Sequence, residues 1–220
     1  MKFIGAQPSL YTTRVSLDLN AIPIKIYKTD FRLKKDLLEK IKNYSYHDDK
    51  GRIKVRLSNS QSILTEYKEL DHIRKYFNAI AMDYTRNVLE IDNDLVMPHS
   101  WIAMTTKGHS HHEHTHQNAL FSIVYYANIN SGNLNLAVEK SSIEKLFNFH
   151  YKIKNYNIYN SCAWSITPGI GDFIVFPADV RHRTDINTAE EERIIVGANY
   201  FLTGKSGDQI QLTKLDIQWP

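Results

Sequence analysis

The sequence lacks the features that define several common protein classes. Cys162 is its only cysteine, so no disulfide can form within the chain, and this is typical of a reducing compartment. No apolar run approaches the ~20 residues that a membrane-spanning helix needs. The N-terminal segment is too polar for a secretory signal. The sequence therefore predicts a cytoplasmic protein with no membrane partner.

The chain also lacks a strong excess of charge of either sign. Its formal net charge of +3 over 220 residues is too small to indicate a nucleic-acid partner. Hydrophobic residues make up 42% and charged residues 23%, which excludes wholesale disorder. There is no internal repeat and no low-complexity linker. These features predict one domain that covers residues 1–220.

The hydrophobic period changes near Pro98. Before it, residues 31–43 and 62–89 carry apolar side chains at helical spacing, after a short alternating stretch at 22–28. After it, the period is 2, and the apolar runs are short and rich in β-branched and aromatic residues. Irregular residues 144–165 interrupt this half as a long loop. We therefore predict an α+β protein with a helical part at about 1–97 and a β-sandwich or barrel at about 98–216.

Five of the ten histidines lie between His109 and His116, in a loop between two predicted strands. In an extended chain His112, His114 and His116 share one face, and His111 and Glu113 share the other. Two histidines one residue apart can bind one metal ion, but imidazole suits iron, zinc, copper and nickel alike. The alternative is a solvated polar loop without a metal.

A second signal follows about 65 residues later along the chain. His182 comes just after the apolar run that ends at Pro177, and Arg193 opens the next apolar strand. A guanidinium at the head of a buried strand is costly unless an anion meets it. A salt bridge to one of the acidic residues 190–192 is the simpler explanation for Arg193 taken alone.

Taken in order, these motifs resemble the 2-oxoglutarate (2OG) and Fe(II) dependent oxygenases, within a phage- and bacteria-associated subgroup of the prolyl-hydroxylase-like set. That subgroup has a Ser-Trp strand, an HxHP motif, a Ser-Gly-Val-Tyr-Tyr strand, and a later His with a downstream Arg. The matching residues here are Ser100-Trp101, His114-Thr115-His116, Ser122-Ile123-Val124-Tyr125-Tyr126, Pro168 to Pro177, His182 and Arg193. The sequence departs at Gln117 and Ile123, and the wider superfamily has Asp or Glu where His116 stands.

The resemblance implies a double-stranded β-helix, or jelly roll, with the N-terminal helices packed outside it. It implies Fe(II) on His114, His116 and His182, with no catalytic residue beyond these ligands. It also implies 2OG as cosubstrate, its distal carboxylate held by Arg193 and Tyr126, with Ser122 on the same face as Tyr126. The pair His111 and Glu113, which spells HxE, is the alternative to His114 and His116.

The resemblance further implies hydroxylation of a substrate with release of succinate and CO2, with ascorbate as an optional reductant. The substrate, a small molecule or a protein, cannot be read from the sequence. The oligomeric state is also open, with a homodimer as one option, and a viral chain would act in the host cytoplasm. The rival hypotheses are a cupin-like metal-binding protein or virion component without 2OG catalysis, and a three-histidine enzyme such as a thiol dioxygenase.

Overall fold

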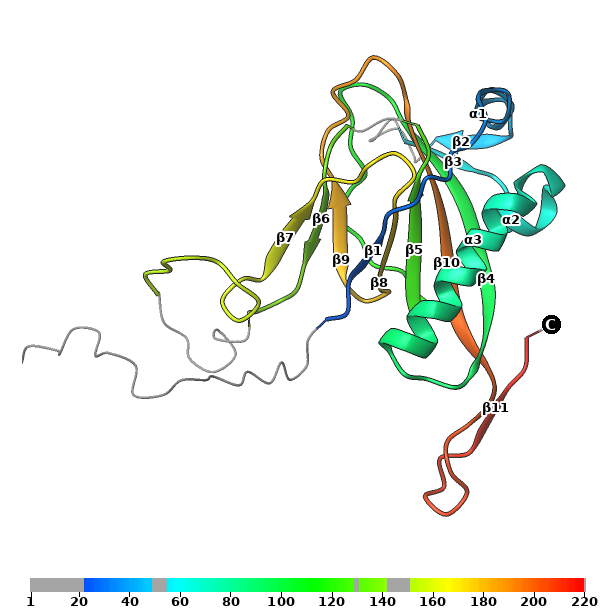
Figure 1. Cartoon of the computed structure of the whole chain (residues 1–220), viewed down its shortest axis with the longest axis vertical. Helices are drawn as coiled ribbons and strands as arrows, with labels where there is room; N and C mark the ends of the chain where they lie inside the picture. Colours follow the sequence, from blue (N-terminus) through cyan, green and yellow to red (C-terminus); the bar gives the residue numbers. More distant parts are fainter. Residues whose placement is uncertain (1–21, 49–54, 129–130, 142–150, 220) are drawn as a thin grey trace, which may run out of the picture.

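The computed structural model describes residues 22–48, 55–128, 131–141 and 151–219, which form two antiparallel sheets with helices on one side (Figure 1). The larger sheet contains β1 (Lys25–Tyr27), β2 (Tyr46–Asp48), β3 (Val55–Ser58), β4 (Asp94–Thr105), β5 (Phe121–Tyr126), β8 (Phe173–Pro177), β10 (Arg193–Ser206) and β11 (Leu215–Ile217). The smaller sheet contains β6 (Leu134–Ala137), β7 (Ala163–Ile166) and β9 (Arg181–Thr184).

The strand order places β10 at the centre of the larger sheet. This order is β1-β8-β5-β10-β4-β3-β2, and β11 pairs with the last residues of β10. The smaller sheet has the order β7-β6-β9. All pairings between these named strands are antiparallel. Two antiparallel sheets that face one another agree with the predicted jelly roll.

The central strands alternate between two hydrophobic cores, because successive side chains on a strand point to opposite faces. One core lies between the larger sheet and the helices, where Ile194, Val196 and Phe173 pack against Phe77 of α3 (Asp71–Asp83). The second core lies between the two sheets and joins residues such as Val124 and Ile174 to Leu136 of β6. Phe176 and Trp101 of this second core contact His116.

The helices lie where the periodicity predicts them, but the second helical segment is interrupted. The predicted helix over 31–43 is α1 (Lys35–Lys42), with Ile41 buried. The segment over 62–89 is divided into α2 (Ile63–Glu66), a 3-10 turn η1 (Lys68–Leu70), α3, and a π-helical turn η2 (Tyr84–Val88). The first interruption is at Tyr67, whose backbone is extended at φ −102° and ψ 106°.

The sheet does not begin at the change of period near Pro98. Strand β4 starts at Asp94 and crosses this point, and β1, β2 and β3 all precede it. β1 extends the sheet beside β8, with Ile26 opposite Ile174, and β3 pairs with β4. The part of the chain predicted as helical thus also supplies strands to the larger sheet, while the single domain over 1–220 stays a prediction.

Two sequence expectations concern the loop and the membrane. The predicted loop over 144–165 falls partly outside the described residues; residues 151–162 contain neither helix nor strand, and β7 follows at Ala163. In the described part of the chain, no helix has the length and apolar character needed to cross a bilayer.

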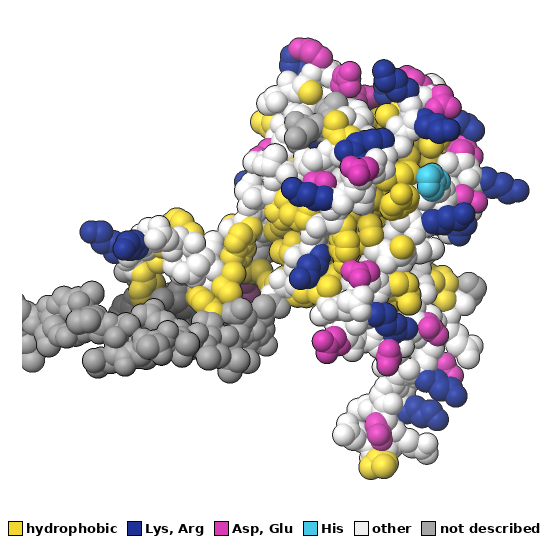
Figure 2. All heavy atoms as spheres, in the orientation of Figure 1, with side chains coloured by type: hydrophobic (Ala, Val, Ile, Leu, Met, Phe, Trp, Pro, Cys, Tyr) yellow, Lys and Arg dark blue, Asp and Glu magenta, His cyan; other side chains and the backbone are white. Residues whose placement is uncertain are grey.

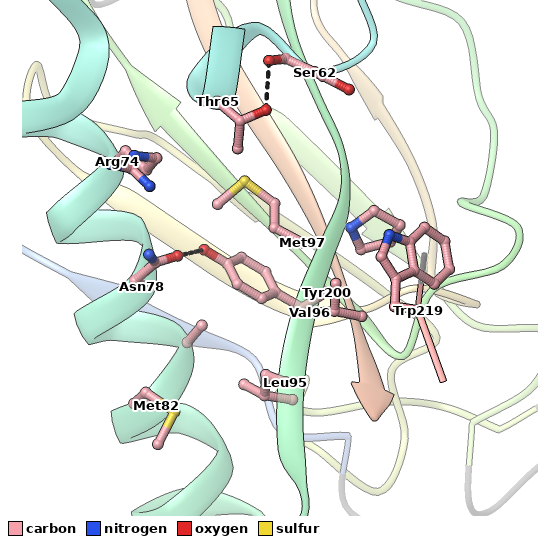
Figure 3. Close-up of a pocket in the computed structure, with 12 residues that line it drawn as sticks. Ser62, Thr65, Arg74, Asn78, Met82, Leu95, Val96, Met97, Tyr200 and Trp219 are labelled. Carbon is pink, nitrogen blue, oxygen red and sulfur yellow. Dashed lines mark hydrogen bonds between the residues drawn. The ribbon is translucent and has the colours of Figure 1, made fainter. Parts of the chain in front are cut away.

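One face of the molecule has a hydrophobic middle (Figure 2), and a hollow on the helix side is lined by residues other than the clustered histidines. Figure 2 shows hydrophobic side chains over the middle of one face, with charged side chains mostly around its margin. A hollow of about 600 Å³ opens on the helix side, between α3 and the first residues of β4 (Figure 3). There Tyr200 donates a 2.9 Å hydrogen bond to Asn78 Oδ1, and Met97 and Trp219 line the wall.

Candidate metal centre and cosubstrate site

Three histidines from two separate segments lie together between the sheets. The ligand atoms of His114, His116 and His182 all lie within 4.8 Å of one another. His116 Nε2 is 3.1 Å from His182 Nε2, and the ring centroids of His114 and His182 are 4.3 Å apart. His182 is on β9, while His114 and His116 are in the loop between β4 and β5.

Backbone hydrogen bonds tie that loop along the edge of β9. His114 and His182 exchange two N–H to O bonds of 3.0 Å, so the two residues form an isolated antiparallel bridge. His116 N donates to Ala178 O at 2.8 Å. Main-chain hydrogen bonds therefore hold the HxH motif beside the distant strand β9, independently of any metal.

Two of the imidazoles are oriented by backbone acceptors. His114 Nδ1 lies 2.9 Å from His112 O, and His182 Nδ1 lies 3.0 Å from Val180 O. A carbonyl oxygen can only accept, so each Nδ1 carries the proton and each Nε2 carries the lone pair. This is the tautomer that metal-binding histidines usually have when their second nitrogen donates to a carbonyl.

Burial keeps His116 and His182, and the adjacent His111, neutral at pH 7. Burial, and then the neighbouring His182 and His114, lowers the pKa of His116 to about 3. Burial, and then His114, lowers the pKa of His182 to about 4. Burial, and then His114, also lowers the pKa of His111 to about 3. A neutral imidazole is the form that binds a metal.

The alternative pair, His111 and Glu113, does not come together. The exposed Glu113 carboxylate is 3.2 Å from Arg181 Nη1. The His111 ring lies inside the cluster, with its centroid 4.5 Å from that of His114, against the sequence expectation that it points to the opposite face. The reason is that residues 109–113 do not form a regular strand, so strict alternation does not apply to them.

Arg193 is buried without an ion-pair partner. Its side chain is 2% exposed, and its Nη1 donates to Ser131 O at 2.7 Å and Asp185 O at 3.2 Å. Its Nη2 donates to Thr184 Oγ1 at 2.6 Å. Within the described ranges no carboxylate lies within ion-pair distance of it, and burial lowers its pKa. Glu192 instead pairs with Arg56 at 2.7 Å, so the simpler salt-bridge explanation is wrong.

Tyr126 lies on the same face as Arg193 and has an unsatisfied hydroxyl. Tyr126 pairs with Ile195, two residues after Arg193 on β10, so all three side chains point toward the smaller sheet. The Tyr126 hydroxyl is buried and has no hydrogen-bond partner among the described residues, and burial raises its pKa. A buried hydroxyl without a partner is costly, so this hydroxyl is available to donate to an added group.

Ser122 differs from Tyr126 although both lie on the same face of β5. Its hydroxyl donates to Asn199 Oδ1 at 2.8 Å, and both residues are buried. This bond occupies the only donor of Ser122. Its predicted role toward 2OG stays a prediction, as do the roles of Tyr126 and Arg193.

Thr184 and Gly132 complete the surroundings of Arg193, and sequence reasoning did not single them out. A Cβ at Gly132, whose φ is +79°, would lie 2.6 Å from Arg193 Nη1, so only glycine fits. Thr184 is two residues after His182 on β9, so strand alternation places both on one face. That spacing was the available signal for Thr184, whereas nothing in the sequence distinguishes Gly132.

The arrangement fits both groups that the resemblance implies. Two ligands at ~2.1 Å from one metal and at right angles are roughly 3.0 Å apart, which agrees with the 3.1 Å between the two Nε2 atoms. The guanidinium without a carboxylate and the unsatisfied hydroxyl fit an added carboxylate. Both groups fit on residues already in place.

Comparison with known proteins agrees with the resemblance. Residues 99–199 match the family model described as "Putative 2OG-Fe(II) oxygenase". This match covers slightly under half of the 220 residues, and over that range the chain is similar to the 2OG-Fe(II) oxygenases. The matched range includes all the candidate site residues, from His114 to Arg193. No curated protein matches the sequence.

Solved structures share the fold at low sequence identity. A 2OG-Fe(II) oxygenase family oxidoreductase from Burkholderia pseudomallei is 11% identical with a TM-score of 0.54, over 80% of this chain and 83% of that one. A prolyl hydroxylase from Trichoplax adhaerens, in complex with a hypoxia inducible factor peptide fragment, is 13% identical with a TM-score of 0.55, over 83% and 85%. HygX from Streptomyces hygroscopicus, with nickel, 2-oxoglutarate and hygromycin B bound, is 10% identical with a TM-score of 0.56, over 83% and 84%.

These similarities confirm the predicted fold. The largely antiparallel arrangement of this chain is similar to the double-stranded β-helix of 2OG oxygenases, with its helices outside the larger sheet.

Proposed function

We propose that this protein is a 2OG- and Fe(II)-dependent dioxygenase that hydroxylates an unidentified substrate. In the overall reaction, one atom of dioxygen enters the substrate hydroxyl and the other enters succinate, as 2OG loses CO2. His114, His116 and His182 hold the iron, and Arg193 with Tyr126 holds the distal carboxylate of 2OG.

The observation that carries this proposal is the buried cation beside the unsatisfied hydroxyl. Arg193 is 2% exposed and bonded only to two carbonyls and a hydroxyl, so its charge is not neutralised by any described residue. Tyr126 contributes a hydroxyl that lacks an acceptor. A carboxylate placed between them gains charge-assisted hydrogen bonds and removes both costs.

The three imidazoles give the site its metal-binding character. All are neutral ligands, so a bound divalent cation keeps its full charge, which favours a dianionic cosubstrate. Fe(II), when bound there, supplies the redox chemistry with dioxygen and 2OG. The protein fixes the ligand nitrogens, excludes water through the core between the sheets, and sets the position of the cosubstrate.

The main rival is a metal-binding or virion protein of the same fold without 2OG catalysis. Such a protein needs the three histidines but has no use for a buried arginine without an anion. A three-histidine enzyme that lacks 2OG, such as a thiol dioxygenase, is separated by the same argument. Arg193 is therefore the residue that discriminates among these functions.

The decisive experiment is a titration of 2OG into the anaerobic Fe(II) forms of wild type and Arg193 variants. Arg193→Ala should leave metal binding intact and weaken 2OG by about 2–5 kcal/mol, the cost of removing one partner of a desolvated charge pair. Arg193→Lys should recover only part, because a point charge does not reproduce the guanidinium fork. Arg181→Ala, an exposed arginine paired with Glu113, is the matched control and should bind 2OG normally.

Equal 2OG affinities in wild type and Arg193→Ala would overturn the proposal and favour the metal-only rival. If 2OG binds as expected, the substrate can be sought by mass spectrometry, as products gaining one oxygen in extracts supplied with iron, 2OG and ascorbate as reductant. Small molecules and protein side chains are both within the proposal. We also propose a cytoplasmic location, because Fe(II) and a lone thiol at Cys162 suit a reducing compartment, and a phage or bacterial source.

A further inference from the structure

Trp101 contacts the metal-ligand cluster, and the proposed function gives it no role. Its indole stacks on the His116 imidazole, with ring centroids 5.1 Å apart and planes 26° apart. Trp101 is on β4, one residue after Ser100, and points toward the smaller sheet with the second core. The side chain is partly buried at the level of the histidines.

The three imidazoles differ in how the protein orients them. His114 and His182 each donate Nδ1–H to a backbone carbonyl. His116 has no such bond, since no acceptor in the described part of the chain lies within hydrogen-bond distance of its Nδ1. Its surroundings are rings, namely Trp101, Phe176, His114 and His182. The plane of the His116 ring is therefore set by stacking, where its neighbours rely on hydrogen bonds.

Gly197 provides the space for the indole. Gly197 is directly opposite Trp101 in the register of β4 with β10. A Cβ at Gly197 would lie 2.4 Å from Cε2 and Cζ2 of Trp101, closer than any side chain can approach. Glycine in the middle of a central strand weakens the strand, and it often marks a close approach by another group. Here the approaching group is the ring that stacks on His116.

We propose that Trp101 is a positioning residue for His116. Gly197, which has no side chain, leaves the space that lets the indole of Trp101 reach the imidazole. The pair holds the His116 ring in the plane that directs Nε2 to the metal. This inference rests on the proposed function, because it requires His116 to be a metal ligand. It also accounts for the departure at His116: a carboxylate at this position has no ring face for Trp101 to stack on.

The first test replaces the ring face while keeping apolar bulk. The metal-free Trp101→Leu and Trp101→Phe variants are titrated anaerobically with Co(II), and affinity and the visible spectrum of the bound ion are measured. Leucine should weaken binding by about 10–100-fold, the usual range for losing a group that orients a ligand, and should change the Co(II) spectrum. Phenylalanine keeps a ring face and should retain most of the affinity.

The second test leaves Trp101 chemically intact. Gly197→Ala should displace the indole and reproduce the loss seen with Trp101→Leu. Because both changes remove one contact, the double variant should bind no worse than the weaker single variant. Trp219→Leu is the control, since Trp219 is 48% exposed, lines the hollow on the helix side and should leave Co(II) affinity unchanged.

The outcomes separate this inference from the proposed function. If the wild type binds no Co(II) at the histidines, the proposed function fails. If the wild type binds and both Trp101→Leu and Gly197→Ala bind equally well, Trp101 is only a packing residue, even where the variants melt at lower temperature. If Trp101→Leu does not fold, Gly197→Ala and Trp101→Phe decide, because weak binding by the first and normal binding by the second are both required.

Discussion

The two faces of strand β10 have opposite compositions although both are buried. Toward the helices the strand presents Ile194, Val196, Ala198 and Tyr200, which belong to a continuous hydrophobic core. Toward the smaller sheet it presents Arg193, Ile195, Gly197 and Asn199. The helix-side polar group is satisfied, since the Tyr200 hydroxyl bonds to Asn78. On the opposite face, no described residue supplies a counter-ion for Arg193 or an acceptor for the neighbouring Tyr126 hydroxyl, and Gly197 leaves space for a ring.

Under the proposed function, one strand serves stability on one face and ligand binding on the other. Side-chain alternation allows this because neighbours along the chain are separated by the sheet itself. Groups that are costly for folding are concentrated on the face that carries the proposed 2OG site, and such local costs are common at functional sites. Changes on the two faces should therefore have separable effects on stability and binding.

The largest effect is expected at the histidines between the sheets. His182→Ala leaves two imidazoles and should abolish stoichiometric binding of a divalent metal, a loss larger than the roughly 10–100-fold of a change behind the ligands. Metal content after dialysis, measured by mass spectrometry, checks this. His109→Ala is the control from the same His-rich loop. If the two variants lose metal equally, the ligand assignment fails.

The largest effect on the helix side should appear in stability alone. Phe77 is fully buried and contacts the Phe173 ring edge-on at 5.2 Å. Phe77→Ala should lower the free energy of unfolding by about 3–5 kcal/mol, because it removes a large side chain and leaves a cavity. Urea denaturation measures this loss. Metal affinity of the folded variant should be unchanged, and a parallel loss of affinity would contradict the separation of the two faces.

As the pH falls, protonation of the buried histidines should be the first cause of destabilisation in the metal-free protein. The folded-state pKa values of His111, His116 and His182 are about 3, 3 and 4, well below the ~6.5 of an unfolded histidine. The contribution of these histidines to the free energy of unfolding is fully present above pH ~6.5. It is lost as the pH falls toward 4 and 3, because the unfolded chain binds protons first. The unfolding free energy measured against pH should show this slope, and His111→Gln should reduce it.

The helix side should respond in a more acidic window. The hydrogen bond from Lys40 lowers the pKa of Glu69 to about 2. This carboxylate stabilises the fold above pH ~4.5, the ordinary value, and the contribution is lost as the pH falls toward 2. Glu69→Gln should alter the pH dependence only below pH ~4.5. A change at pH 5–6 in this variant would show that the two windows are not separate.

The smallest and most selective effects should come from two tyrosines. Tyr126→Phe removes a hydroxyl that has no partner among the described residues, so it should not lower stability. It should weaken 2OG binding by about 1.5–3 kcal/mol, the value for a hydrogen bond to a charged group. Tyr200→Phe removes the bond to Asn78 and should cost about 0.5–1.5 kcal/mol of stability without affecting 2OG. Paired denaturation and 2OG titrations test both. Reversed effects would refute the comparison.

Much of the fold could be predicted because local patterns are strong in this chain. The period-2 runs gave β5, β8 and β10, and the apolar stripe over 31–43 gave α1. The break at Tyr67 and the short strands β2 and β3 were not predicted. Two strands of three and four residues carry too little alternation to be recognised, and they exist because β4 offers them an edge.

The candidate site could be predicted in its residue types but not in its surroundings. The resemblance to the 2OG-Fe(II) oxygenases implied His114, His116 and His182 as the three ligands, and the structure brings these residues together. Strict alternation misplaced His111, because the loop is tied to β9 by isolated hydrogen bonds and is not a regular strand.

The sequence by itself determined the periodicities, the order of the motifs and the supply of imidazole and guanidinium groups, because these are properties of neighbours along the chain. Only the tertiary structure decided that Glu192 turns to Arg56, that Arg193 is buried without a counter-ion, and that Trp101 rests on Gly197 against His116. Each of these depends on contacts between strands far apart in sequence. Their distances are fixed by sheet register and packing, which no local pattern encodes.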